Sequence, residues 1–165
     1  MTSRSSAAPV AHRFTRGEYY RMAKVGLFQD ARVELLDGEI ITMSAQLSPH
    51  AFVVNQLMYL LIAQLGSSAI VRVQAPIVLN NLSEPEPDLA VCLPVPDRYS
   101  REHPQANQVL FVIEVAESSL RYDRTRKVRA YAASGIAEYW IVNLVDRRVE
   151  KLTDPTPKGR NYKRQ

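Results

Sequence analysis

Glu114 is an ionisable residue inside a short run, residues 109–115, whose other members are all apolar. A run that is apolar on both faces is typical of a central strand in a sheet. Burying an ionised carboxylate in such a strand is costly unless the charge is paired or binds a metal ion. Glu114 is therefore expected to form a structural ion pair with an arginine, to lie at a strand end that faces water, or to act in a functional site.

Asp88 stands at the first position of a second apolar run, residues 88–93, and follows Pro87. If the strands formed by the two runs are antiparallel neighbours, the start of one lies beside the end of the other. The carboxylates of Asp88 and Glu114 would then meet at one edge of the sheet. The simpler alternative is that Asp88 only caps a turn after Pro87.

The residue types near these carboxylates indicate a hard cation that prefers oxygen ligands. Proteins hold Mg²⁺ with one or two carboxylates together with water and substrate phosphates. Zinc is disfavoured, because His12, His50 and His103 have no metal-binding spacing and each is expected at the surface or at a helix end. The single cysteine, Cys92, lies in an apolar run and is expected to be a small buried hydrophobic residue.

A strongly basic segment follows Glu114, since residues 121–129 contain five basic residues and one acid. One interpretation is a solvated helix face, on which Asp123 and Lys127 form an ion pair one turn apart. The other is a phosphate-contacting helix, with Lys127 orienting or deprotonating the attacking water and offsetting charge on the phosphorane. The candidates for contacts with a nucleic-acid backbone are then Arg124, Arg126 and Arg129.

These residues must be positioned by a mixture of helices and strands. The sequence predicts helices over 15–27, 48–65 and 122–134, a hairpin at 33–41, and strands at 70–79, 88–93, 109–115, 139–145 and 148–153. Thr15 and Glu18 form a capping-box pattern, and Asp37-Gly38 indicates a tight hairpin turn. In the helix over 48–65 we expect one broad buried stripe, made of Phe52, Val53, Leu57, Leu60, Leu61 and Leu65. The order of elements favours an α/β (α+β) fold in which helices flank a mixed β-sheet.

The chain of 165 residues is expected to form one domain at 14–153, between a flexible tail at 1–13 and a loose basic tail at 154–165. Its 21 basic and 17 acidic residues give a net charge of +4, which is compatible with a polyanionic partner. We expect no signal peptide, and the longest apolar stretch is too short to span a membrane. With one cysteine, a reducing cytoplasm is the simplest location.

Five blocks of residues carry a resemblance to a known family: Glu34-Leu35-Leu36-Asp37-Gly38-Glu39-Ile40, Ser48-Pro49-His50, Glu86-Pro87-Asp88-Leu89-Ala90-Val91, Val112-Ile113-Glu114-Val115-Ala116-Glu117-Ser118-Ser119, and Asp123-x-x-x-Lys127-x-x-x-Tyr131-Ala132-x-x-Gly135-Ile136-x-Glu138-Tyr139-Trp140-Ile141-Val142. They resemble the Uma-two family of restriction-type endonucleases, which belongs to the PD-(D/E)xK nuclease superfamily. The resemblance covers about residues 14–153, and its block from Glu114 to Val142 is specific.

The resemblance implies a restriction-endonuclease-like sheet flanked by helices, with a divalent-metal nuclease site. Asp88 would be the aspartate of the Pro-Asp motif, and Glu114 would be the acid of the second motif. The superfamily usually places a lysine two residues beyond that acid, where this chain has Ala116. Lys127, in the following helix, matches the lysine that the family supplies instead.

Two further implications concern the ends of the chain. Glu34 resembles an additional N-terminal carboxylate that supports the metal, although Glu39 lies close to it in sequence. Members of the family usually continue with further β structure, which implies that the loose tail at 154–165 is the end of a truncated domain.

We therefore expect a Mg²⁺- or Mn²⁺-dependent endonuclease acting on DNA, with Asp88, Glu114 and Glu34 at the metal and Lys127 assisting the nucleophile. A homodimer is implied by analogy, since cutting both strands of a duplex needs two sites or two events. One alternative is a nucleic-acid-binding protein without catalysis on a nuclease fold. Another is a structural or partner-binding domain whose acids are ion-paired.

Overall fold

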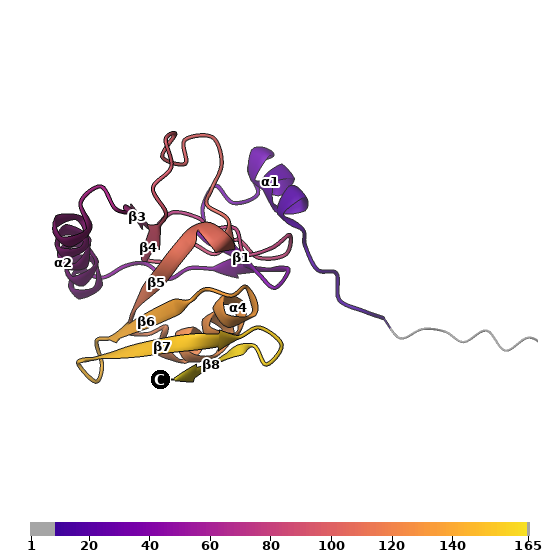
Figure 1. Ribbon diagram of the computed structural model, residues 1–165. Helices are drawn as coiled ribbons and strands as arrows, with labels where there is room; N and C mark the ends of the chain where they lie inside the picture. Colours follow the sequence, from indigo (N-terminus) through magenta and orange to yellow (C-terminus); the bar gives the residue numbers. More distant parts are fainter. Residues whose placement is uncertain (1–8, 165) are drawn as a thin grey trace, which may run out of the picture.

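The structure is a computed structural model that describes residues 9–164 (Figure 1). Its helical segments are α1 (Arg16–Lys24), α2 (Ser48–Leu65), η1 (Ala106–Gln108), α3 (Leu120–Tyr122), η2 (Asp123–Lys127) and α4 (Val128–Ala133). Its strands are β1 (Val33–Leu36), β2 (Glu39–Thr42), β3 (Ile70–Val73), β4 (Leu89–Cys92), β5 (Val109–Ala116), β6 (Glu138–Asn143), β7 (Arg148–Thr156) and β8 (Asn161–Arg164).

The main sheet has six strands in the order β3-β4-β5-β6-β7-β8, and β1 pairs with β2 in a separate hairpin. Strands β5 and β6 are parallel, whereas the other neighbours in the main sheet are antiparallel. A parallel pair needs a crossover connection, and here the helical segment α3–η2–α4 provides it. The fold is thus the expected α+β arrangement of a mixed sheet with flanking helices.

Strand β5 separates two apolar clusters, because successive side chains of a strand point to opposite faces of the sheet. On one face, Ile113 lies in a cluster with Val54 of α2. On the other face, Val112 lies in a cluster with Tyr131 of α4. Glu114 shares the face of Val112 and therefore points toward the helical segment that follows β5.

Both local turn signals of the N-terminal part are confirmed. Thr15 caps α1 in a capping box with Glu18, whose carboxylate accepts a hydrogen bond from the backbone N–H of Thr15 at 2.8 Å. Asp37 and Gly38 have φ values of 51° and 76°, which is the conformation that a type I′ turn requires at its two central residues. Helix α1 ends at Lys24, three residues before the predicted end.

The C-terminal segment differs from the expectation, because the loose tail predicted over 154–165 is an ordered hairpin as far as Arg164. Strand β7 continues to Thr156, and β8 pairs with it antiparallel. Tyr162 anchors β8, since it is 4% exposed and its hydroxyl donates to the backbone oxygen of Ile136 at 2.9 Å. The sequence did not predict this strand, because its prolines and basic residues are typical of a loop and its single buried aromatic residue gives no alternating pattern.

Two predicted helices are corrected in detail. Phe52 and Leu60 of α2 are 63% and 59% exposed, so the broad buried stripe is wrong for both residues. A helix that packs against a single layer buries just a narrow stripe of its surface. In α2 the fully buried residue is Val54. The helix predicted over 122–134 begins at Leu120 and contains a π turn, η2, that no apolar pattern indicated.

Other boundaries also shift. The strand predicted over 70–79 ends at Val73, because Gln74 adopts a φ of 48° and the chain leaves the sheet there. Of the tail predicted over 1–13, residues 1–8 lie outside the described residues, and residues 9–13 form no regular element. Among residues 9–164, no helix has the length and apolarity needed to cross a membrane.

Candidate active site

A pocket of about 640 Å³ lies where the β1–β2 hairpin, the start of α2, the adjoining ends of β4 and β5, and the α3–η2 segment meet. Its lining contains four acids that are buried in the protein: Glu34, Asp88, Glu114 and Asp123. The buried side chain of Lys127 and the imidazole of His50 also line it. The chain thus brings ionisable groups from five separate segments into one cavity.

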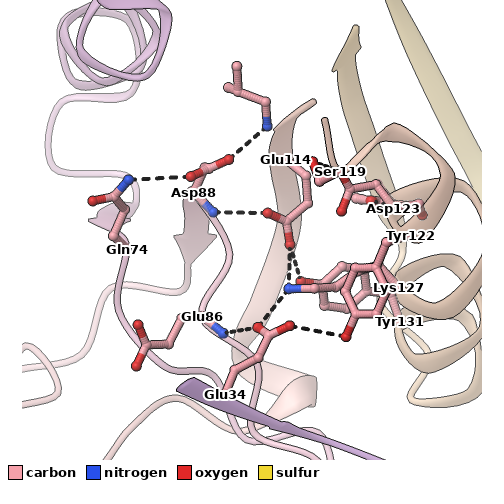
Figure 2. Close-up of polar contacts among 12 residues, drawn as sticks. Glu34, Gln74, Glu86, Asp88, Glu114, Ser119, Tyr122, Asp123, Lys127 and Tyr131 are labelled. Carbon is pink, nitrogen blue, oxygen red and sulfur yellow. Dashed lines mark hydrogen bonds and ion pairs between the residues drawn. The ribbon is translucent and has the colours of Figure 1, made fainter. Parts of the chain in front are cut away.

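The register of the β4–β5 pair explains why Asp88 and Glu114 are neighbours. Leu89 is paired with Ile113, so the residue before β4 lies beside the residue that follows Ile113. The backbone N–H of Asp88 donates to Glu114 Oε2 at 3.2 Å (Figure 2). The backbone N–H of Val115 donates to Asp88 Oδ2 at 2.9 Å. The antiparallel arrangement expected from the sequence is confirmed, and the carboxylate of Asp88 belongs to this pair of strands rather than to a local turn.

Lys127 reaches the carboxylates from the π turn η2. Its Nζ donates to Glu34 Oε2 at 2.8 Å and to Glu114 Oε1 at 3.0 Å, as Figure 2 shows. One helical turn later, the hydroxyl of Tyr131 donates to the same Oε1 of Glu114 at 2.6 Å. The side chain of Lys127 is only 4% exposed, so the surface ion pair with Asp123 that the sequence also allowed is not formed.

The electrostatics of the pocket favour an additional positive charge. Burial raises the pKa of the Glu114 carboxyl well above its usual value, an effect that the ammonium of Lys127 opposes and the carboxylate of Asp88 strengthens. Burial acts to lower the pKa of Lys127, but the carboxylates of Glu114 and Glu34 outweigh it and raise that pKa. The buried acids of the lining outnumber its buried ammonium group, so a bound cation would favour their ionised forms.

Glu34, rather than Glu39, is the N-terminal acid that enters the pocket. Besides Lys127, it accepts hydrogen bonds from the backbone N–H of Glu86 at 3.0 Å and from the hydroxyl of Tyr122 at 3.3 Å. Glu39 has a side chain that is 59% exposed and that pairs with a surface arginine. The contacts of Glu34 make it an anchor for Lys127, and a direct role at a metal stays a prediction.

Two residues of the site were not predicted from the sequence. His50 Nε2 lies 3.0 Å from Asp88 Oδ2, and this hydrogen bond raises the pKa of the imidazole. Asp123 is 3% exposed, and it accepts a hydrogen bond from Ser119 Oγ at 2.6 Å. Burial raises the pKa of the Asp123 carboxyl. The local signals were the position of His50 in the first turn of α2 and the four-residue spacing of Asp123 from Lys127. Both residues also stand in the blocks that carry the resemblance described above.

The three arginines predicted to contact nucleic acid lie outside the lining of the pocket. Arg124 pairs with Glu150 at 2.9 Å, and Arg126 pairs with Glu39 at 3.1 Å. Arg129 is exposed on α4. Their contact with a nucleic-acid backbone stays a prediction.

The donor chemistry of the pocket fits a hard divalent cation. Within residues 9–164, no three side chains of His, Cys, Asp or Glu form a ready cluster for a metal ion. Mg²⁺ does not require such a cluster, because one or two carboxylates with water and substrate phosphates complete its coordination. Asp88 and Glu114 supply two neighbouring carboxyl groups in a pocket whose buried acids outnumber its buried ammonium group, and the fit to a divalent cation rests on this.

Comparisons with known proteins find a matching family and a similar solved structure. The Uma2 family, described as "Putative restriction endonuclease", matches residues 16–165. Among solved structures, the chain is similar to a crystal structure described as that of a "putative nuclease" from Anabaena variabilis ATCC 29413, with a TM-score of 0.59. The two chains are 14% identical, and the match covers 89% of this chain and 86% of that one, so the likeness shows the fold. The comparison with curated proteins finds no match.

The family match includes every residue of the pocket described above, from Glu34 on the hairpin to Lys127 on η2. It also includes the β7–β8 hairpin at one edge of the sheet. The chain belongs to the Uma2 family, whose description is that of a restriction-type nuclease.

Proposed function

We propose that the protein is a divalent-metal-dependent endonuclease that hydrolyses phosphodiester bonds in DNA. The observation that carries the proposal is the meeting of two adjacent carboxylates, Asp88 and Glu114, with the buried ammonium of Lys127 in one pocket. Phosphodiester hydrolysis needs positive charge at the phosphate and an activated water, and this combination of groups serves both.

In the proposed site, Asp88 and Glu114 hold Mg²⁺ or Mn²⁺. The cation supplies charge that polarises the phosphate and favours ionisation of water. Lys127 offsets negative charge that develops on the phosphorus oxygens, and Glu34 holds the ammonium in place. The family description and the net charge of +4 support a nucleic-acid substrate.

The test is cleavage of a supercoiled plasmid by the purified protein with Mg²⁺, Mn²⁺ or EDTA. We expect metal-dependent nicking or cutting that Glu114→Gln and Asp88→Asn both lose, because each variant removes a carboxylate charge while keeping the side-chain shape. Glu39→Gln is the matched control, since this exposed acid lies outside the pocket and the variant should cut like the wild type.

The outcomes separate the proposal from its alternatives. Cleavage that persists in Asp88→Asn would remove this residue from the mechanism. The folded wild-type protein could instead bind DNA in a salt-sensitive way and fail to cut it with either Mg²⁺ or Mn²⁺. That outcome would identify a non-catalytic nucleic-acid binder.

We also propose that two copies of the chain pack through α2. This helix contains no Asp, Glu, Lys or Arg, and one of its faces exposes Phe52, Tyr59, Leu60 and Ile62. Two chains that each carry a charge of +4 repel, so an uncharged apolar face is the surface on which they meet at least electrostatic cost. Light scattering after gel filtration should give a dimer for the wild type and a monomer for Leu60→Glu. A monomeric wild type at the same concentration would refute this.

A further inference from the structure

Asp123 is a buried acid of the pocket that has no part in the function proposed above. It lies on η2, four residues before Lys127, and is 3% exposed. Its Oδ2 accepts a hydrogen bond from Ser119 Oγ at 2.6 Å, and its backbone oxygen accepts one from the hydroxyl of Tyr139 at 3.2 Å. Figure 2 shows Ser119 and Asp123 together on the helix side of Glu114. The carboxyl is therefore held in a defined orientation.

The hydrogen bonds of Asp123 set it apart from the other buried acids of the pocket. Both carboxylate oxygens of Glu34, Asp88 and Glu114 have polar partners among residues 9–164. In the same part of the chain, Oδ1 of Asp123 has no hydrogen-bond partner. Unlike His50 Nδ1, the Oδ1 atom is not fully enclosed by the protein. Because the side chain of Asp123 lines the pocket, we take Oδ1 to be accessible from it.

A hydrolytic site needs a group that takes a proton from the attacking water, and the other bases of the pocket are not placed to do so. Lys127 Nζ donates to two carboxylates, so it is an ammonium without a free electron pair. His50 Nε2 contacts Asp88, and its Nδ1 is enclosed by the protein. Asp123 is the buried acid of the lining that keeps a free oxygen.

We propose that Asp123 is a catalytic residue that accepts the proton of the attacking water through Oδ1. This inference rests on the proposed nuclease function. In the step, an O–H bond of the water breaks and the proton moves to Asp123, while the water oxygen forms a bond to phosphorus. The bond from phosphorus to the leaving oxygen breaks, and that oxygen keeps the electron pair and takes a proton from a solvent water. Asp123 then releases its proton to the hydroxide that remains, which regenerates the carboxylate.

Two features of the surroundings support this role. The hydrogen bond from Ser119 leaves Oδ1 as the oxygen that is free to react. Burial also makes the carboxylate a stronger base than an exposed aspartate. Lys127, four residues along the same helical segment, lies near enough for its ammonium to stabilise the ionised carboxylate.

The experiment compares single-turnover cleavage of a DNA duplex at saturating Mg²⁺ by the wild type, Asp123→Asn and Asp123→Ala. The matched control is Glu117→Gln, because Glu117 is an exposed acid at the rim of the same pocket. Mg²⁺-dependent thermal shifts and DNA affinity are measured for every variant. Sodium formate is then added to each protein, because it can occupy the space that the alanine variant vacates and accept the proton itself.

We expect Asp123→Asn to cut about 10²–10⁴-fold more slowly, with thermal shift and DNA affinity unchanged. Formate should restore cleavage to Asp123→Ala, whereas it should leave the wild type and Glu117→Gln unaffected. A purely structural residue would lose stability or affinity and would not be rescued by a small base.

The failures of the two proposals are distinguishable. If the folded wild type fails to cut DNA whichever divalent metal is added, the nuclease proposal is overturned, and the proposal for Asp123 is overturned with it. A wild type that cuts, together with an Asp123→Asn variant that cuts within about threefold of it, overturns the role of Asp123 alone. Absence of formate rescue in a folded Asp123→Ala protein also overturns it.

Discussion

Lys127 and Glu34 form a buried ion pair at 2.8 Å, although 93 positions separate them in the chain. The pair ties the N-terminal hairpin to the helical segment that follows β5. It also holds the ammonium beside Glu114, so that this contact links the N-terminal hairpin to the chemistry of the pocket.

Removing one partner of this pair should destabilise the protein more than removing both. Lys127→Met leaves Glu34 and Glu114 buried without their cation, and a broken buried pair typically costs about 3–5 kcal/mol. The double variant Glu34→Gln with Lys127→Met should recover part of that loss, because Glu34 is then no longer an uncompensated charge. Urea unfolding of the wild type, both single variants and the double variant measures this. Additive losses would show that the two side chains are not coupled.

Divalent cations should stabilise the folded protein through Asp88. A ligand that binds only the folded state adds about 2.7 kcal/mol at a hundredfold excess over its Kd. We expect the Tm to rise as Mg²⁺ or Mn²⁺ is added to the wild type and to stay constant for Asp88→Asn. An equal rise in both proteins would place the cation elsewhere, and no rise in the wild type would support the view that the acids are only ion-paired.

The surface pair of Glu150 and Arg124 should make stability depend on pH in the acidic range. The hydrogen bond from Arg124 lowers the pKa of Glu150 to about 2. A carboxyl whose folded pKa is depressed stabilises the protein above its ordinary pKa, and that stability is lost as the pH falls toward 2. We expect Glu150→Gln to cost about 1 kcal/mol at pH 7, a value discounted for the partial exposure of the pair.

The measurement is the free energy of unfolding of the wild type and Glu150→Gln between pH 2 and pH 7. The difference should shrink steadily below the ordinary carboxyl range and vanish near pH 2. A difference that is the same at both ends would mean that the ionised form of Glu150 is not what stabilises the fold.

Gly38 should be harder to replace than Gly135, although both have positive φ, 76° and 74°. A Cβ at position 38 would lie 2.6 Å from Cβ of Arg13, whereas a Cβ at position 135 would meet nothing within 4 Å. Gly135→Ala should cost about 1 kcal/mol from backbone strain alone, and Gly38→Ala should cost more, because it adds a steric clash. Thermal unfolding of the two variants compares them directly. Equal losses would show that the segment around Arg13 moves away freely.

Several parts of the protein could be predicted from the sequence because their causes are local. The capping box of Thr15 and Glu18 lies within one helical turn, and the Asp37-Gly38 turn depends on two residues that tolerate positive φ. The apolar run around Glu114 needs a buried strand whatever its neighbours are. The meeting of Asp88 with Glu114 also followed, since antiparallel pairing of consecutive strands leaves little choice of register.

Tertiary structure alone decided the rest. Tyr162 anchors β8 to the rest of the fold through its hydrogen bond to the backbone oxygen of Ile136. No local sequence pattern predicts this contact. His50 reaches Asp88 only because α2 begins beside the ends of β4 and β5. Asp123 becomes buried through the π turn and the packing of the crossover segment, because the burial of a polar side chain is set by what covers it and not by its neighbours in sequence.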